Sequence, residues 1–172
     1  MIKDIPPELY GDLHAPNYDA LFDEGMTFGF GWDFTRIDAE TLLFSRVLPD
    51  SPAARAGIER GERLVAIDGE ALDEFLERPS EERDRILGLP DTPTTISLGI
   101  ESGDGTRREV SLRSESFPLV TVEALDVVEH AGTRVGYLRF ASFLETSRAE
   151  LDEAFDTLAA EDVGELVLDL RY

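Results

Sequence analysis

The sequence feature that decides the fold is the stretch at residues 51–69, which reads SPAARAGIERGERLVAIDG. Ser51 is a favourable N-cap for a helix, and Gly57 is a favourable end for it. The alternation at residues 63–67 predicts a strand, and the Asp-Gly pair at 68–69 predicts a tight turn after it. We therefore expect a short alanine-rich helix that packs closely against a sheet.

Strand patterns flank this stretch on both sides. Aromatic residues alternate over residues 28–34 and predict a half-buried strand, and residues 41–48 predict another. Further along, residues 95–101 and 108–113 flank a Gly-Asp-Gly turn, which predicts a hairpin. The segment of about 26–117 is therefore expected to be a small β-rich module with two helices.

The second of these helices begins at Ser80. Two glutamates follow it, which favours the first turn of a helix, and Gly88 ends the pattern. At the N-terminus, Asn17 can cap a helical turn that Gly25 ends. We therefore expect a helical lead over residues 1–25.

The last segment, residues 118–172, has a different pattern. Residues 134–140 and 165–171 predict two apolar strands. Between them, residues 147–150 match a capping box, and apolar residues at helical spacing follow over 151–159. A strand–helix–strand order with apolar strands predicts a parallel pair that is covered on both faces.

The charge of the chain excludes several kinds of partner. The 172 residues contain 37 Asp and Glu against 16 Lys and Arg, a net charge of -21. Proteins that bind nucleic acid present a basic face, so we expect no nucleic-acid partner. No apolar run approaches the roughly 20 residues needed to span a bilayer. The first residues also lack the apolar stretch of a signal peptide. We expect no membrane insertion by this chain.

The residue types that support metal or nucleophilic chemistry are scarce. The sequence has no cysteine, and its two histidines, His14 and His130, are far apart. No histidine spacing typical of a metal site and no Gly-x-Ser-x-Gly turn is present. We therefore expect no metal and no cofactor, and we assign no catalytic residue.

The run GFGW at residues 29–32 is the candidate binding site. Glycines beside aromatic residues let consecutive backbone N–H groups point into one concavity, which can bind a carboxylate. An extended peptide could then add to the edge strand that follows. A glycine-permitted bend in an aromatic strand would explain the same four residues. The candidate peptide-binding residues are Gly29, Phe30, Gly31, Trp32, Arg83, Ile86 and Leu87.

These motifs match a known family. The run at residues 29–32 resembles the carboxylate-binding loop of PDZ domains, and residues 51–69 resemble the bacterial PDZ pattern. Glu62 stands where that pattern usually has an aspartate. The resemblance implies a PDZ domain over residues 26–117, in the permuted bacterial form. In that form, the helix at 80–88 would face the strand that follows the loop.

The last segment resembles the opening of the catalytic domain in carboxy-terminal processing (tail-specific) serine peptidases. The resemblance rests on residues 135–140 and 166–171. It implies a later Asn-x-Gly-Gly loop and a serine–lysine dyad, whereas the single lysine here is Lys3. We therefore expect a catalytically silent fragment of α+β class. The expected domains are a lead (1–25), a permuted PDZ β-sandwich with two helices (26–117), and a partial βαβ peptidase segment (118–172).

The resemblance implies a PDZ module that binds C-terminal tails of protein substrates for proteolysis, in the periplasm or cell envelope. A non-catalytic PDZ scaffold that binds protein partners is the alternative. Asp169 and Arg171 end the last strand. They fit either a strut that orders the chain beyond it or a structural ion pair. Because the last strands would have open edges, we also expect self-association or poor order after residue 118.

Overall fold

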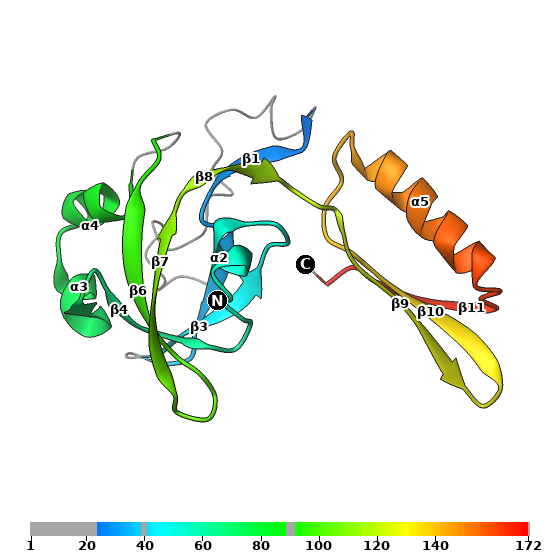
Figure 1. The fold of residues 1–172 in the computed structure, drawn as a ribbon, viewed down its shortest axis with the longest axis horizontal. Coiled ribbons are helices and arrows are strands. Elements are labelled where there is room, and N and C mark those ends of the chain that lie inside the picture. The colour runs from blue at the N-terminus through cyan, green and yellow to red at the C-terminus, as the bar shows by residue number, and fades with distance from the viewer. Residues whose placement is uncertain (1–23, 39–40, 89–91, 172) are drawn as a thin grey trace. The chain divides into compact units, whose positions relative to one another are not determined.

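The computed structural model describes residues 24–38, 41–88 and 92–171. Within them the chain divides into two compact units (Figure 1). The first is Thr27–Pro118, and the second comprises residues 119–171 with 24–26. The helical lead expected over residues 1–25, with its Asn17 cap, lies almost wholly outside the described residues.

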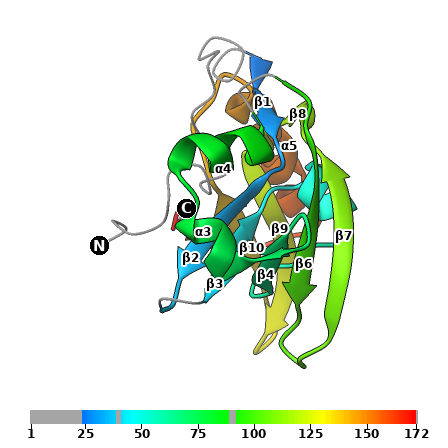
Figure 2. The same ribbon diagram turned by 90° about the vertical axis from the view of Figure 1, so that its left-hand side faces the viewer.

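The first unit is built on an antiparallel sheet in the order β2-β3-β4-β6-β7, seen edge to edge in Figure 2. A short strand, β5, pairs with β4, and β1 pairs with β8 in a separate two-stranded sheet. Because β2 ends the strand order, its outer edge has no strand partner among the described residues. The bounds are β1 (Met26–Gly29), β2 (Trp32–Arg36), β3 (Leu42–Val47), β4 (Arg63–Ile67), β5 (Glu70–Ala71), β6 (Thr95–Glu101), β7 (Arg107–Arg113) and β8 (Glu115–Pro118).

The aromatic alternation at residues 28–34 does not form one strand, so that prediction is wrong. Gly31 has a φ of +84°, which L side chains rarely adopt, and the chain bends there. As a result β1 ends at Gly29 and β2 begins after the bend, in a different sheet. The alternation still indicates burial, since Phe30, Trp32 and Phe34 are 6%, 4% and 4% exposed. The rings of Phe30 and Trp32 stack with centroids 4.8 Å apart.

The described part of this unit has three helices rather than the two expected. The predicted helix after Ser51 is α2 (Pro52–Arg55), and the Ser51 side chain caps it by accepting a hydrogen bond from the Ala54 N–H. The predicted helix at Ser80 is α4 (Ser80–Leu87). The helix α3 (Leu72–Glu77) was missed because it is short: its apolar residues at helical spacing are Leu72, Phe75 and Leu76, which span little more than one turn.

The second unit contains a three-stranded sheet in the order β11-β10-β9, with α5 along one face (Figure 1). The predicted parallel pairing of β10 and β11 is confirmed. The antiparallel neighbour β9 was missed, because its sequence mixes charged and apolar residues without a clear alternation. The bounds are β9 (Val122–His130), β10 (Thr133–Phe140), α5 (Ser147–Ala160) and β11 (Glu165–Asp169). The α+β class expected from the sequence is confirmed.

The predicted capping box at the start of α5 does not form. Thr146 takes the N-cap position with helical backbone angles and no side-chain cap bond, so Ser147 is already the first helical residue. The Glu150 carboxylate instead accepts hydrogen bonds from the N–H groups of Thr121 and Val122, at 2.8 and 2.9 Å. Glu150 therefore fastens the start of β9 to the helix.

The expectation that both strands of the parallel pair are covered on both faces is also wrong for β11. Leu166, Val167 and Leu168 are 42%, 51% and 49% exposed. None of the three belongs to the core cluster that α5 forms with β9 and β10. Self-association through strand edges stays a prediction.

Candidate functional site

The loop at residues 29–32 joins β1 to β2. Two of its carbonyl groups accept hydrogen bonds from residues 48–53, which lead into the start of α2. The Phe30 carbonyl accepts a hydrogen bond from the Ala53 N–H at 2.9 Å. The Gly31 carbonyl accepts one from the Leu48 N–H at 2.9 Å and one from the Ser51 hydroxyl at 3.4 Å. These bonds fix the direction of both peptide groups.

The N–H groups of Gly31 and Trp32 point the opposite way. The peptide bonds of the loop are trans, so the N–H of each of its residues lies opposite the carbonyl that precedes it. The Gly31 N–H therefore points away from Ala53. The bond from Leu48 to Gly31 makes Trp32 and its β3 partner a non-hydrogen-bonded pair, which turns the Trp32 N–H to the open edge of β2. Among hydrogen bonds between described residues, none has the Phe30 or Gly31 N–H as its donor.

The loop packs too closely against α2 for any side chain at Gly31. A Cβ added there would lie 2.1 Å from the Cβ of Ser51 and 3.0 Å from the Cζ of Phe117. Ser51 is fully buried. Glycine is therefore required at position 31 for two reasons: the positive φ and the close approach of Ser51.

The candidate residues on α4 are less directly placed. Ile86 and Leu87 are partly buried and pack against the core cluster that contains Phe30 and Trp32. The Arg83 guanidinium donates a hydrogen bond to the Leu76 carbonyl at 2.8 Å, at the end of α3. A role for these three α4 residues in binding a peptide stays a prediction.

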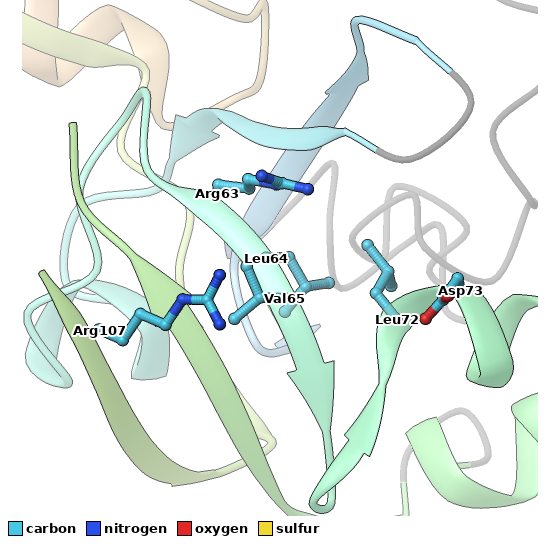
Figure 3. A pocket seen from close by; sticks show the side chains of 6 residues that line it. All are labelled: Arg63, Leu64, Val65, Leu72, Asp73 and Arg107. Atoms are coloured by element: carbon cyan, nitrogen blue, oxygen red, sulfur yellow. The ribbon is translucent and has the colours of Figure 1, made fainter. Parts of the chain in front are cut away.

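A cavity of about 180 Å³ lies elsewhere in the first unit, beside β4 and α3 (Figure 3). Two arginines lie in it, but both pair with Glu101, at 3.8 and 2.6 Å, so their attraction for an anion is reduced. The cavity contains none of the residues predicted to bind a peptide. It is lined by Arg63, Leu64, Val65, Leu72, Asp73 and Arg107.

Glu62, the departure from the bacterial PDZ pattern, is 7% exposed and is the centre of a polar network. Its carboxylate accepts hydrogen bonds from the Arg108 guanidinium, the Ser102 hydroxyl at 2.6 Å and the Glu59 N–H at 2.9 Å. The bond from Arg108 is the main cause that lowers the pKa of Glu62 from 4.5 to about 2. The network ties the start of β4 to the β6–β7 hairpin, which is a structural role.

The pair at the end of β11 is present and has a third member. Asp169 is 5% exposed and accepts hydrogen bonds from the Arg171 Nε and Nη2, at 2.8 and 2.7 Å. The Tyr137 hydroxyl, on β10, donates to it at 2.8 Å. The Arg171 bonds, with that of Tyr137, hold the pKa of Asp169 well below its usual range, and Asp169 raises the pKa of Tyr137. Sequence reasoning missed Tyr137 because it lies on the neighbouring strand.

Two features are absent from residues 24–38, 41–88 and 92–171. In that part of the chain, no three His, Asp or Glu side chains gather where they could hold a metal ion. No described helix has both the length and the apolar character needed to cross a membrane.

Comparison with known proteins shows which family this chain resembles. A family model described as a PDZ domain matches residues 43–96. The chloroplastic carboxyl-terminal-processing peptidase 3 of Arabidopsis thaliana is 33% identical over 138 residues, which covers 76% of this chain and 26% of the relative. A carboxyl-terminal-processing protease of a Picosynechococcus species is 33% identical over 169 residues, covering 97% and 38%.

A solved structure agrees with these relatives. An S41 protease of Bacteroides fragilis superposes with a TM-score of 0.59 at 26% identity, covering 88% of this chain and 42% of that one. The chain thus spans about a quarter to two-fifths of the length of these three proteins. The family resemblance inferred from the sequence is confirmed. Over the part that it spans, this chain carries a PDZ domain and belongs with the carboxyl-terminal-processing proteases.

Proposed function

We propose that the PDZ module of this chain binds the C-terminal tails of protein substrates and delivers them to a serine–lysine peptidase centre elsewhere in a longer protein. The observation that carries the proposal is the set of backbone N–H groups at Phe30, Gly31 and Trp32. The N–H groups of Gly31 and Trp32 face away from α2, beside the open edge of β2, and the Phe30 N–H donates to no described residue. The kinship with carboxyl-terminal-processing proteases supplies the reaction class.

A carboxylate suits such a group of donors. Backbone N–H groups donate charge-assisted hydrogen bonds to an anion, and these are roughly twice as strong as neutral ones. A peptide whose terminal carboxylate binds at Gly31 can continue along β2 as an additional strand, since that edge is unpaired in the described sheet. Capture of the tail raises its effective concentration at the peptidase centre.

The charge of the chain predicts which tails bind best. With a net charge of -21, the chain repels an acidic tail at low ionic strength. We expect apolar or basic tails to bind more tightly, and the affinity for an acidic tail to rise with added salt.

The test is a calorimetric titration with one apolar peptide in two forms, with a free carboxyl terminus and with an amidated one. The expected result is binding of the free form at least about tenfold tighter, which corresponds to about 1.4 kcal/mol. Equal affinities of the two peptide forms would refute the proposal.

We also propose, as the sequence resemblance implies, that the protein acts in the periplasm or cell envelope. Fractionation of the source cells tests this, and recovery of the protein in the cytoplasmic fraction alone would contradict it.

A further inference from the structure

We propose that Ser51 is the positioning residue of the carboxylate site: it holds the loop so that the N–H groups at Gly31 and Trp32 face the tail. This inference rests on the proposed function, since it concerns the same site. Ser51 is 0% exposed, so its side chain cannot touch a ligand. Any effect of Ser51 on binding must therefore be indirect, through the backbone groups that its hydroxyl contacts.

The hydroxyl of Ser51 makes hydrogen bonds with two backbone groups. Its oxygen accepts a hydrogen bond from the Ala54 N–H at 3.1 Å, and its hydrogen is donated to the Gly31 carbonyl at 3.4 Å. A serine hydroxyl has one donor hydrogen and two acceptor lone pairs, so both bonds form together. Ser51 thus connects the first turn of α2 to the loop.

The connection acts on the direction of an N–H group. The Gly31 carbonyl and the Trp32 N–H belong to one planar peptide group, and they point in opposite directions. The carbonyl is held by Ser51 and Leu48, so the N–H is turned to the open edge of β2. Rotation of this peptide group would move the donor away from a bound carboxylate.

Ser114 offers a closely matched control in the same unit. It is 3% exposed, its oxygen accepts from the Thr94 N–H at 2.9 Å, and its hydroxyl donates to the Thr94 carbonyl at 3.4 Å. Ser114→Ala therefore removes the same two kinds of bond from an equally buried serine. It leaves residues 29–32 and the segment that holds them untouched.

The experiment measures the affinity of the free-carboxylate peptide divided by that of its amidated form, for wild type, Ser51→Ala and Ser114→Ala. Fluorescence of Trp32, the single tryptophan, verifies folding of each variant. We expect Ser51→Ala to lower the ratio about fivefold, the change that one lost hydrogen bond produces, and Ser114→Ala to leave it unchanged. A purely structural role would affect both serine variants alike.

Each outcome separates the two proposals. A wild-type ratio well above one that Ser51→Ala leaves unchanged overturns the role of Ser51 and leaves the proposed function standing. A wild-type ratio of one overturns both. If Ser51→Ala does not fold, Ser51→Gly replaces it, because glycine at an N-cap costs little stability. The same fall in the ratio is expected for that variant, and an unchanged ratio again overturns the inference.

Discussion

Substitution of Gly31 by alanine tests the close packing of the loop against α2. The added Cβ would lie 2.1 Å from the Cβ of Ser51. Neither atom can move by a side-chain rotation, so the backbone of the loop or of α2 must shift. Gly105→Ala is the matched control, since its φ is also +84° and nothing lies within 4 Å of the added Cβ.

The expected magnitudes follow from these two environments. A left-handed φ costs an L residue roughly 1–2 kcal/mol, and the lower entropy of the unfolded alanine chain offsets about 0.4–1 kcal/mol of it. Gly105→Ala should therefore lower the free energy of unfolding by about 1 kcal/mol. Overpacking adds roughly 1–3 kcal/mol at Gly31, so Gly31→Ala should lower it by about 3 kcal/mol.

The assay is equilibrium unfolding in urea, followed by the fluorescence of Trp32, which is 4% exposed in the native state. The double variant Gly31→Ala with Ser51→Gly removes the obstructing Cβ and should recover about 2 kcal/mol relative to Gly31→Ala alone. Equal costs for the two glycine variants, or no recovery in the double variant, would refute the packing argument.

Three further predictions concern the polar contacts. Glu62→Gln should lower the free energy of unfolding by about 2 kcal/mol at pH 7, less than the full pKa shift implies because the arginine partner is 33% exposed. Since the pKa of Glu62 is lowered from 4.5 to about 2, this stabilisation is complete above pH 4.5 and is lost as the pH falls toward 2. Urea unfolding of wild type and variant should converge there, and a persistent gap would argue against the ion pair. Tyr137→Phe removes a donor and should raise the pKa of Asp169 in a carboxyl NMR titration, whereas an unchanged titration would show that the bond is absent. Glu150→Gln should speed amide hydrogen exchange at residues 121–122, because a neutral acceptor binds these N–H groups less tightly, and equal exchange rates would contradict the role of this carboxylate.

Elements whose determinants lie within a few residues could be predicted from the sequence. The cap of α2 depends on Ser51 and on the N–H of Ala54, and the β6–β7 hairpin depends on the turn between its strands. The glycines of the loop at 29–32 likewise indicated a bend, and the structure places one at Gly31. The binding of a carboxylate by the donors of this loop stays a prediction.

Features that depend on distant residues could not be predicted in this way. The direction of the loop N–H groups is set by Leu48 and Ala53, which reach it through the folding of α2 against β1 and β2. Glu150 has the position and residue type of a capping box. Its carboxylate instead accepts hydrogen bonds from the N–H groups at the start of β9. A single sequence does not show whether a side chain will bond to a local backbone group or to one that the fold brings near.

The most direct test of the central claim is an NMR titration of the isotope-labelled chain with the free and the amidated tail peptide. The amide protons of Phe30, Gly31 and Trp32 are the reporters. If these groups bind the terminal carboxylate, their proton resonances move strongly downfield with the free peptide and little with the amidated one. Resonances that stay in place with the free peptide, or that respond alike to both forms, would contradict the account.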